Sequence, residues 1–435
     1  MAMIRERDQV SVTKPPAVPS LDADPALPQA SDEDLILALG RALHQVGQPA
    51  HRLESTLGRV AARLDLEIHA FSLPTGLLIS FERPGDGKTT TRLLRLPLRP
   101  TNLECLRRLS IESEALACGR VAPREAIGRV KELANAPRRW GPTATAAGFL
   151  LSASAFSVFF GGGLRELGVA SGLGLAVGLV ALAFGRSRAM SRRFELTAAA
   201  VAGFIAALAD VYLGHFVHWI PLASGLVILL PGLSLVDSIE ELANGHLTSG
   251  ASRMAGVGIV FLALIFGVLM GVSLVGLIAE DSAPGSAIPL PWWAPLLALP
   301  VVALGSTFRF QARLADMPWI LVGSAVAFGV SRAGGHLGNP LLGPFLGALV
   351  LGMAANLYAR WRDPSPQLLI VPGLALLVPG SFGLRSLDSL MSGASVTGLE
   401  QGFQMFMMTI ALVAGLLFSN AMVASEVNPR LPAGP

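Results

Sequence analysis

Charged residues are scarce in this chain of 435 residues. Asp, Glu, Lys and Arg supply only 14% of the sequence, while hydrophobic residues supply 52%. A soluble globular domain has about 25% charged residues, so this composition excludes an ordinary soluble protein. Most of the charge falls in residues 1–140, and the remainder is mainly apolar runs joined by short polar links. We therefore expect a mainly α-helical polytopic membrane protein preceded by a soluble region.

Signals for cofactors, nucleotides and nucleic acids are also sparse. The only cysteines, Cys105 and Cys118, form no CxxC pair and have no histidine at a metal-ligand spacing, so we expect two reduced, packed thiols. The segment GDGKTT at 85–90 lacks the first glycine of a phosphate-binding loop, where Glu82 stands instead. Lys and Arg form no stripe interleaved with aromatic residues, so no nucleic-acid partner is expected. We expect no cofactor and no bound metal.

The N-terminal third has the pattern of a small soluble domain. Residues 1–34 are rich in proline, alanine and charge and lack the apolar core of a signal peptide, which predicts a disordered tail. Residues 35–137 predict a cytoplasmic α/β domain, because Leu35, Leu39 and Leu43 have helical spacing and alternating segments follow. Its expected elements are a helix from near Asp34, a helix at 50–64, strands at 66–73, 77–83 and 90–96, and helices near 101–118 and 123–135.

Ten apolar segments follow, each close to the roughly 20 residues that a helix needs to cross a bilayer. They are 142–160, 167–184, 196–213, 217–235, 254–277, 290–308, 317–332, 341–359, 367–384 and 403–423. The first five make up an expected membrane repeat at 138–278, and the other five a second repeat at 279–424. A short tail at 425–435 ends the chain.

Arginine is very unevenly shared between alternate loops. One set of loops has only Arg165, Arg332 and Arg385, and the other set, which begins with Arg138 and Arg139, holds the rest of the loop arginines. Because arginine-rich loops stay in the cytoplasm, we expect both termini and the N-terminal domain to be cytoplasmic. All six tryptophans lie at or near predicted span ends, where an amphipathic ring prefers the headgroup level.

An internal repeat supports this map. The segment ILLPGLSLVDSIEELANGHLTSG at 228–250 recurs in weaker form, 148 residues later, as LLVPGSFGLRSLDSLMSGASVTG at 376–398. The same shift carries spans one to five onto spans six to ten without a gap. Because five is odd, the second copy enters the bilayer in the opposite orientation. Inverted repeats of this kind are typical of secondary transporters, which bind substrate near the midplane and alternate access by rocking.

Three Pro-Gly pairs fall inside predicted spans. They are Pro231 with Gly232, Pro379 with Gly380, and Pro372 with Gly373. Proline removes a backbone donor and glycine adds conformational freedom, so the first two pairs predict breaks in spans four and nine, and the third adds a break in span nine. A break exposes helix N-terminal amides that suit a carboxylate.

Polar side chains near these breaks are the candidate site. Besides the two repeated Pro-Gly pairs, the candidate substrate-binding residues are Ser234, Asp237, Ser238, Ser381, Arg385 and Asn356. A carboxylate inside hydrocarbon is costly unless it is paired or hydrated, so Asp210 in span three is a candidate for proton coupling, together with Asp237 and Glu241. Two plainer interpretations stay open: the Pro-Gly pairs end their spans and helix 235–244 lies in the interface, or Asp210 lies near the interface with access to water.

The first repeat resembles the threonine/serine exporter family in LLPGLSLVDSIEELANGHLTSGASRM. The residues that carry the resemblance are Pro231, Gly232, Asp237, Glu241, Gly245, His246, Gly250 and Arg253. The segment 47–66 is similar to an N-terminal helix of that family, with Leu53 where valine is usual, and 376–393 is similar to a motif of its second half. The resemblance implies a fused two-half exporter of threonine, serine or similar solutes, driven by the proton gradient, in a bacterial inner (plasma) membrane.

We therefore predict a transporter and not an enzyme. Its expected partners are a small solute, protons and the lipid bilayer, with self-association into a homo-oligomer left open. An exporter of short carboxylates such as succinate is the first alternative. An intramembrane enzyme that uses His51 and Glu54 is another, although a salt bridge at the surface or between domains is the default interpretation of these residues. A channel is the last alternative.

Overall fold

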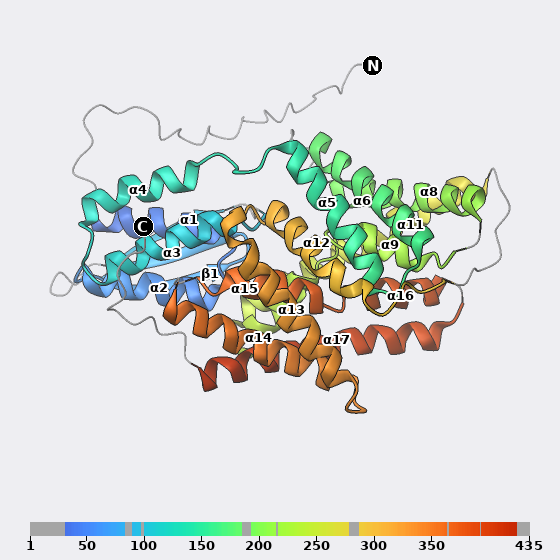
Figure 1. The fold of residues 1–435 in the computed structure, drawn as a ribbon. Coiled ribbons are helices and arrows are strands. Elements are labelled where there is room, and N and C mark those ends of the chain that lie inside the picture. The colour runs from blue at the N-terminus through green and yellow to red at the C-terminus, as the bar shows by residue number, and fades with distance from the viewer. Residues whose placement is uncertain are drawn as a thin grey trace, which may run out of the picture.

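The computed structural model describes residues 31–82, 89–96, 100–184, 193–214, 216–277, 287–362, 365–391 and 393–423. The predicted tails lie outside these residues, except that the first helix begins at Asp32, inside the expected N-terminal tail. The blue N-terminal domain lies to one side of the helices of the first repeat, in green and yellow, and of the second, in orange and red (Figure 1).

The N-terminal domain is the predicted α/β unit. Its elements are α1 (Asp32–Gln45), α2 (Ala50–Arg63), β1 (Glu67–Leu73), β2 (Gly76–Glu82), β3 (Thr89–Arg95), α3 (Leu103–Ala117) and α4 (Pro123–Asn135). The three strands form an antiparallel sheet in chain order. Ser31 and Asp34 form a capping box that starts α1, and Gly47, at a φ of 88°, follows its end.

The apolar spacing of α1 places one face of that helix in the domain core. Leu35, Leu39 and Leu43 are fully buried, and they share one hydrophobic cluster with Leu77 and Phe81 of β2. The predicted spacing is therefore confirmed. The expectation of two reduced, packed thiols is half right, because neither cysteine forms a disulfide but only Cys105 is buried and Cys118 is exposed.

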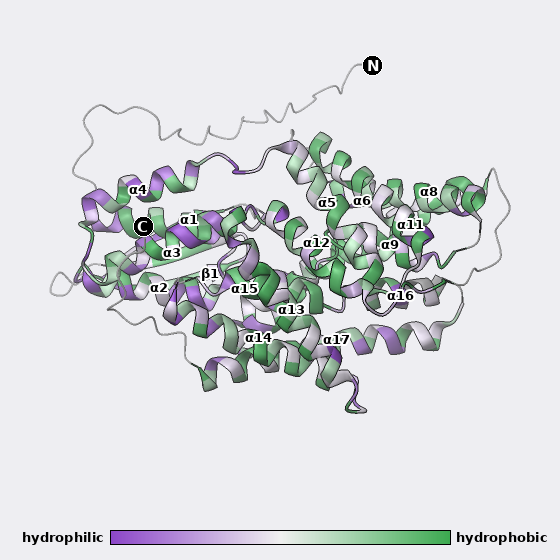
Figure 2. Ribbon diagram, in the orientation of Figure 1, coloured by the Kyte–Doolittle hydropathy of each residue, from purple (hydrophilic) through white to green (hydrophobic). Residues whose placement is uncertain are grey.

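The remaining described elements are nearly all helical. The first repeat contains α5 (Pro142–Phe159), α6 (Leu164–Phe184), α8 (Phe194–Leu213), α9 (Trp219–Leu226), α10 (Gly232–Ala243) and α11 (Leu247–Gly276). The second contains α12 (Ala294–Arg309), the short 3-10 helix η1 (Leu314–Asp316), α13 (Met317–Gly335), α14 (Leu342–Trp361), α15 (Gln367–Leu377), α16 (Gly380–Met391) and α17 (Ser395–Met422). Figure 2 shows hydrophobic residues along these helices and more hydrophilic residues in the N-terminal domain.

Eight helical segments of the described residues are long and apolar enough to cross a membrane. They correspond to eight of the ten predicted spans, and the chain is thus a polytopic helical membrane protein. The predicted span 290–308 is the shorter apolar helix α12, and the predicted span 217–235 is divided between α9 and α10. The first exception is a single helix of 16 residues, and the second contains a break between two short helices.

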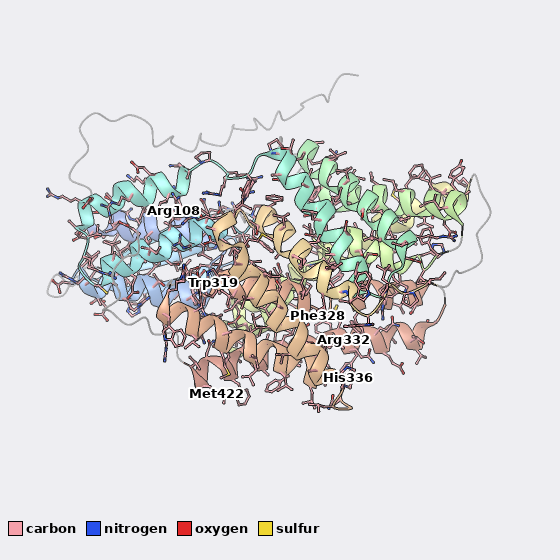
Figure 3. The ribbon with its side chains drawn as sticks, in the orientation of Figure 1. Arg108, Trp319, Phe328, Arg332, His336 and Met422 are labelled. Carbon is pink, nitrogen blue, oxygen red and sulfur yellow. The ribbon has the colours of Figure 1, made fainter. Side chains whose placement is uncertain are left out.

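The tryptophans confirm where the helices end. Trp140 lies just before α5, and Trp292 and Trp293 lie just before α12. Trp219 and Trp319 lie at the starts of α9 and α13, and Trp361 is the last residue of α14. Helix α13 runs from Trp319, near the N-terminal domain, to Arg332 and His336 at its other end (Figure 3).

The two repeats correspond residue by residue over much of their length. A shift of 148 residues carries Phe194–Leu213 onto Leu342–Trp361, so α8 and α14 coincide at both ends. The same shift carries α10 onto α16 at both ends, and carries the first residues of α9 and α11 onto those of α15 and α17. Helix packing follows the same rule, because α8 packs on α11 as α14 packs on α17.

The chain breaks at both repeated Pro-Gly pairs, as predicted. Helix α9 ends at Leu226 and α10 begins at Gly232, with Pro231 as its N-cap residue. Helix α15 ends at Leu377, and α16 begins at Gly380 after an extended residue at Val378.

The third expected break, at Pro372 and Gly373, is wrong, because α15 continues through Pro372. A Cβ on Gly373 would lie 2.7 Å from Leu351 and 3.2 Å from the carbonyl oxygen of Gly323. This close packing against two neighbouring helices holds the segment helical despite the missing backbone donor, which would have bonded near the start of the helix.

Candidate functional site

The two helix breaks touch each other. A Cβ built on Gly232 would lie 2.0 Å from a methyl group of Val378, and a Cβ built on Gly380 would lie 3.2 Å from Leu230. These two contacts are related by the repeat, since 148 residues separate Leu230 from Val378 and Gly232 from Gly380. Each break therefore places a residue without a side chain against the branched side chain that precedes the other break.

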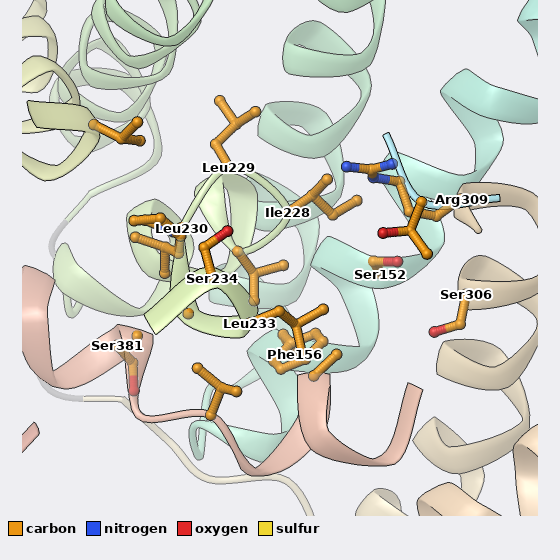
Figure 4. A pocket seen from close by; sticks show the side chains of 18 of the residues that line it. Ser152, Phe156, Ile228, Leu229, Leu230, Leu233, Ser234, Ser306, Arg309 and Ser381 are labelled. Carbon is orange, nitrogen blue, oxygen red and sulfur yellow. The ribbon is translucent and has the colours of Figure 1, made fainter. Parts of the chain in front are cut away.

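A cavity of about 330 Å³ opens beside this crossing. Its size falls at the lower end of the range for small-molecule sites, about 300–1,000 Å³. The wall comes from both repeats and from the N-terminal domain: Pro100, Thr101, Ser152, Phe156, Phe160, Glu195, Val227, Ile228, Leu229, Leu230, Pro231, Gly232, Leu233, Ser234, Val260, Ser306, Arg309, Phe310, Ala375, Val378, Gly380 and Ser381. Figure 4 shows the serines and several of the apolar side chains in this wall.

Hydroxyl groups are the most frequent polar groups in this wall. Ser152 comes from α5, Ser306 from α12, Ser234 from the first turn of α10 and Ser381 from the first turn of α16, and Thr101 belongs to the N-terminal domain. They stand among apolar side chains. Such a site can bind a solute of a few heavy atoms through hydrogen bonds, with an apolar surface that excludes water.

The cavity contains five of the ten predicted substrate-binding residues: Pro231, Gly232, Ser234, Gly380 and Ser381. The other five do not contribute to its wall: Asp237, Ser238, Pro379, Arg385 and Asn356. Ser238 donates a hydrogen bond to the carbonyl of Leu235 within its own helix. Asn356 is fully buried and donates to Asn420 Oδ1 at 2.9 Å and to the carbonyl of Val423 at 2.8 Å.

Four residues that the sequence analysis did not single out also line the cavity: Ser152, Ser306, Arg309 and Glu195. Arg309 follows a predicted span by one residue, so we interpreted it as a loop arginine. Its guanidinium carbon lies 5.9 Å from the ring centre of Phe149 and 5.7 Å from that of Phe310. An arginine directly beside an apolar segment was the one signal that could have indicated it.

Asp210 is buried in α8, with only 6% of its surface exposed. Its Oδ1 atom lies 3.6 Å from Nε2 of His218, on the segment that leads into α9. The same oxygen has no hydrogen-bond partner among the described residues. A buried carboxylate beside a histidine is an arrangement that can exchange a proton.

Glu241 is part of a buried ion pair. Arg253 of α11 donates to both of its carboxylate oxygens, at 2.8 and 3.1 Å, and the Ser249 hydroxyl donates to it at 2.9 Å. Asp237, one turn earlier on α10, lies 3.9 Å from the same guanidinium. This geometry fixes α10 against α11 and leaves Glu241 with a full set of partners.

The N-terminal domain meets α10 and α11 through two histidine–carboxylate pairs. His51 Nε2 lies 3.8 Å from Glu240, and His246 Nδ1 lies 3.7 Å from Glu54, which also accepts a hydrogen bond from the Ser72 backbone. Burial lowers the pKa of His51 to about 4. Burial, aided by the nearby acidic side chains, raises the pKa of Glu240 to about 7. His51 and Glu54 thus lie at the contact between the N-terminal domain and α10 and α11, and because burial keeps His51 neutral near pH 7, its contact with Glu240 is not an ion pair at that pH.

Comparison with known families agrees with this architecture. A family model described as "Putative threonine/serine exporter" matches residues 34–275, and a model described as "Threonine/Serine exporter, ThrE" matches residues 295–422. The chain belongs to the threonine/serine exporter family. It joins both parts of the exporter in one polypeptide, as the sequence resemblance implied. The family is one of membrane transporters and not of enzymes.

Relatives of this chain include fungal membrane proteins. Pheromone-regulated membrane protein 10 of Candida albicans (strain WO-1) is 30% identical over 373 residues, which are 82% of this chain and 33% of that protein. The protein of the same name from Eremothecium gossypii is 26% identical over 416 residues, which are 89% of this chain and 56% of that protein. The chain thus spans between a third and somewhat more than half of these curated relatives. No solved structure matches it.

Proposed function

We propose that this protein is a secondary transporter that exports small hydrophilic amino acids of the threonine and serine type. The observation that carries the proposal is the cavity of about 330 Å³ between the two helix breaks, with hydroxyl groups from both repeats in its wall. Threonine and serine have few heavy atoms, and each offers a hydroxyl that such a wall can bind. Family membership supports the same solute class.

The mechanism that we propose is alternating access. The two repeats are inverted with respect to each other, and each contributes one broken helix to the cavity. Movement of one repeat against the other would shift the two helix breaks along each other at the contacts of Gly232 with Val378 and of Gly380 with Leu230. The cavity would then open to one side of the membrane in one state and to the other side in the second state. From the distribution of arginine between loops, we propose that both termini are cytoplasmic and that the protein lies in a bacterial inner (plasma) membrane.

We further propose that a proton gradient drives export. Asp210 is the first candidate for the proton carrier, because it is buried, pairs with His218 and keeps one oxygen without a hydrogen bond among the described residues. Asp237 and Glu241 are second candidates. Proton uptake by Glu241 would require the loss of its two hydrogen bonds from Arg253.

Transport into everted vesicles tests both parts. Vesicles with the protein should accumulate labelled threonine when a proton gradient is applied and much less when an uncoupler removes it. Asp210→Asn should abolish the gradient-dependent part, whereas Asp65→Asn, an exposed position in the N-terminal domain, should leave it unchanged. Equal accumulation of labelled threonine with and without the proton gradient would reject proton coupling. Competition by succinate but not by serine would replace the amino acids with short carboxylates as substrates.

A further inference from the structure

We propose that Arg309 binds the carboxylate group of the solute inside the cavity. The inference rests on the proposed function only in taking this cavity as the transport site. Arg309 is the last residue of α12 and lines the cavity. In Figure 4 its side chain extends with the guanidinium on the side of Ile228, above Ser152, while Ser306 lies farther away along the same wall.

Aromatic rings hold the Arg309 guanidinium without using its hydrogen-bond donors. Its central carbon lies within 6 Å of the ring centres of both Phe149 and Phe310, at 5.9 and 5.7 Å. Contact with a ring face stabilises the cation, while the N–H groups at the edge of the guanidinium stay available to a planar anion. The rings thus orient the side chain and leave its recognition edge free.

Arg309 has no anionic partner within the described part of the chain. Its Nε atom is buried without a hydrogen bond, and no carboxylate of the described residues lies within ion-pair distance of it. Arg253, by contrast, is satisfied by Glu241 through two hydrogen bonds. A half-buried cation without a counter-ion is left partly desolvated, so a carboxylate that enters the cavity and bonds two N–H groups gains an ion pair that the described residues do not supply.

The second charged residue in the wall, Glu195, indicates that the bound solute is a zwitterion. Among the described residues that line the cavity, Glu195 is the only acidic one and Arg309 is the only basic one. A single guanidinium and a single carboxylate, with serine hydroxyls between apolar walls, complement the carboxylate, ammonium and hydroxyl of a hydroxy-amino acid. A dicarboxylate would find one partner for its two charges.

Arg385 supplies a matched control. It also stacks on aromatic rings, with its guanidinium carbon 3.5 Å from the ring centre of Trp219, and its Nε is likewise buried without a hydrogen bond. It does not line the cavity. The two arginines therefore share their chemistry, and they differ in access to the proposed solute site.

The experiment measures binding to the purified full-length chain in nanodiscs with three probes. Threonine has both charges, 3-hydroxybutanoate keeps only the carboxylate, and threoninol keeps only the ammonium group. Arg309→Gln should weaken binding of threonine and 3-hydroxybutanoate by about 10-fold to 100-fold, the range expected when a charge-assisted pair is lost, and should change threoninol binding less than about twofold. Arg385→Gln should leave all three affinities unchanged.

Arg309→Lys is a control that distinguishes loss of carboxylate binding in Arg309→Gln from a folding defect. It keeps the charge but not the planar fork, so it should bind both carboxylate probes with intermediate affinity and threoninol normally. Unchanged affinity for threonine in Arg309→Gln, or equal weakening of all three probes in both variants, would overturn the inference. If wild-type protein binds 3-hydroxybutanoate through Arg309 but neither binds nor exports threonine, the proposed substrate fails and the role of Arg309 stands.

Discussion

Replacing Gly232 with alanine tests whether the two helix breaks touch. The new Cβ would lie 2.0 Å from one methyl group of Val378 and 3.2 Å from its Cβ atom. Carbon atoms without a bond between them prefer about 3.5–4.0 Å, so one side must move. Val378 has little freedom, because it is β-branched and precedes a proline. We expect Gly232→Ala to destabilise the protein by about 1–3 kcal/mol, the usual cost of overpacking.

A second substitution turns this expectation into a double-mutant cycle. Val378→Ala removes the colliding methyl groups and should cost about 1–2 kcal/mol alone, at ~0.8 kcal/mol for each buried methyl-sized group. The double variant should then be more stable than the sum of the single effects predicts, by at least about 1 kcal/mol. Gly380→Ala, whose Cβ would lie 3.2 Å from Leu230, should be milder.

The assays are the thermal unfolding midpoint of the detergent-solubilised protein and threonine transport in vesicles. Gly232→Ala should lower both, and Gly232→Ala with Val378→Ala should recover most of the transport. A Gly232→Ala variant with the wild-type midpoint and transport rate would refute the contact. So would a double variant that is no more stable than Gly232→Ala alone.

Two further predictions concern the charges around α10. Glu241→Gln should reduce the free energy of unfolding by about 3–5 kcal/mol, because it leaves Arg253 without its buried counter-ion. Glu125→Gln, which removes a partner from an exposed pair, should cost under about 1 kcal/mol. Equal thermal unfolding midpoints for the two variants would contradict this prediction. Burial raises the pKa of Glu240 from 4.5 to about 7, so the folded state binds the extra proton and this residue's contribution to stability is lost as pH rises between these values. The difference in unfolding midpoint between wild type and Glu240→Gln should therefore change across that pH range, and a constant difference would reject the shift.

Much of the fold is visible in the sequence because it depends on local patterns. The predicted strands 66–73, 77–83 and 90–96 lie within one residue of β1, β2 and β3 at each end. The repeat needed no structure either, since the Pro-Gly, glycine and leucine positions of one copy reappear in the other. Span length was less informative. Hydropathy records how apolar a segment is and not where it turns, so the division of 217–235 into two helices was visible only from Pro231 and Gly232.

The residues of the candidate site also differ in whether local sequence or tertiary packing determines their role. Pro231 and Gly380 could be predicted, because a proline or glycine changes the backbone at its own position whatever surrounds it. Ser152 and Arg309 could not, because a serine or a span-end arginine becomes part of a site only through helices that are distant in sequence. Asn356 shows the converse. It had the chemistry of a site residue, but tertiary packing places it against Asn420 and Val423, to which its amide NH2 group donates two hydrogen bonds.

The two repeats share the contacts of their backbones but differ in the polar side chains that line the cavity. Gly250 packs on Leu242 and the Ser238 carbonyl as Gly398 packs on Leu390 and the Ser386 carbonyl, 148 residues later in each case.

The charged and hydroxyl groups of the cavity do not follow this rule. The position equivalent to Arg309 is Gly161, and that equivalent to Ser152 is Pro300. An inverted pair needs equal backbones, because each copy must adopt in one state the arrangement that the other adopts in the opposite state. It needs no equal side chains, because an asymmetric solute has one carboxylate and requires one guanidinium. Symmetry in the glycines and asymmetry in the polar groups are therefore what a transporter of a single small zwitterion requires.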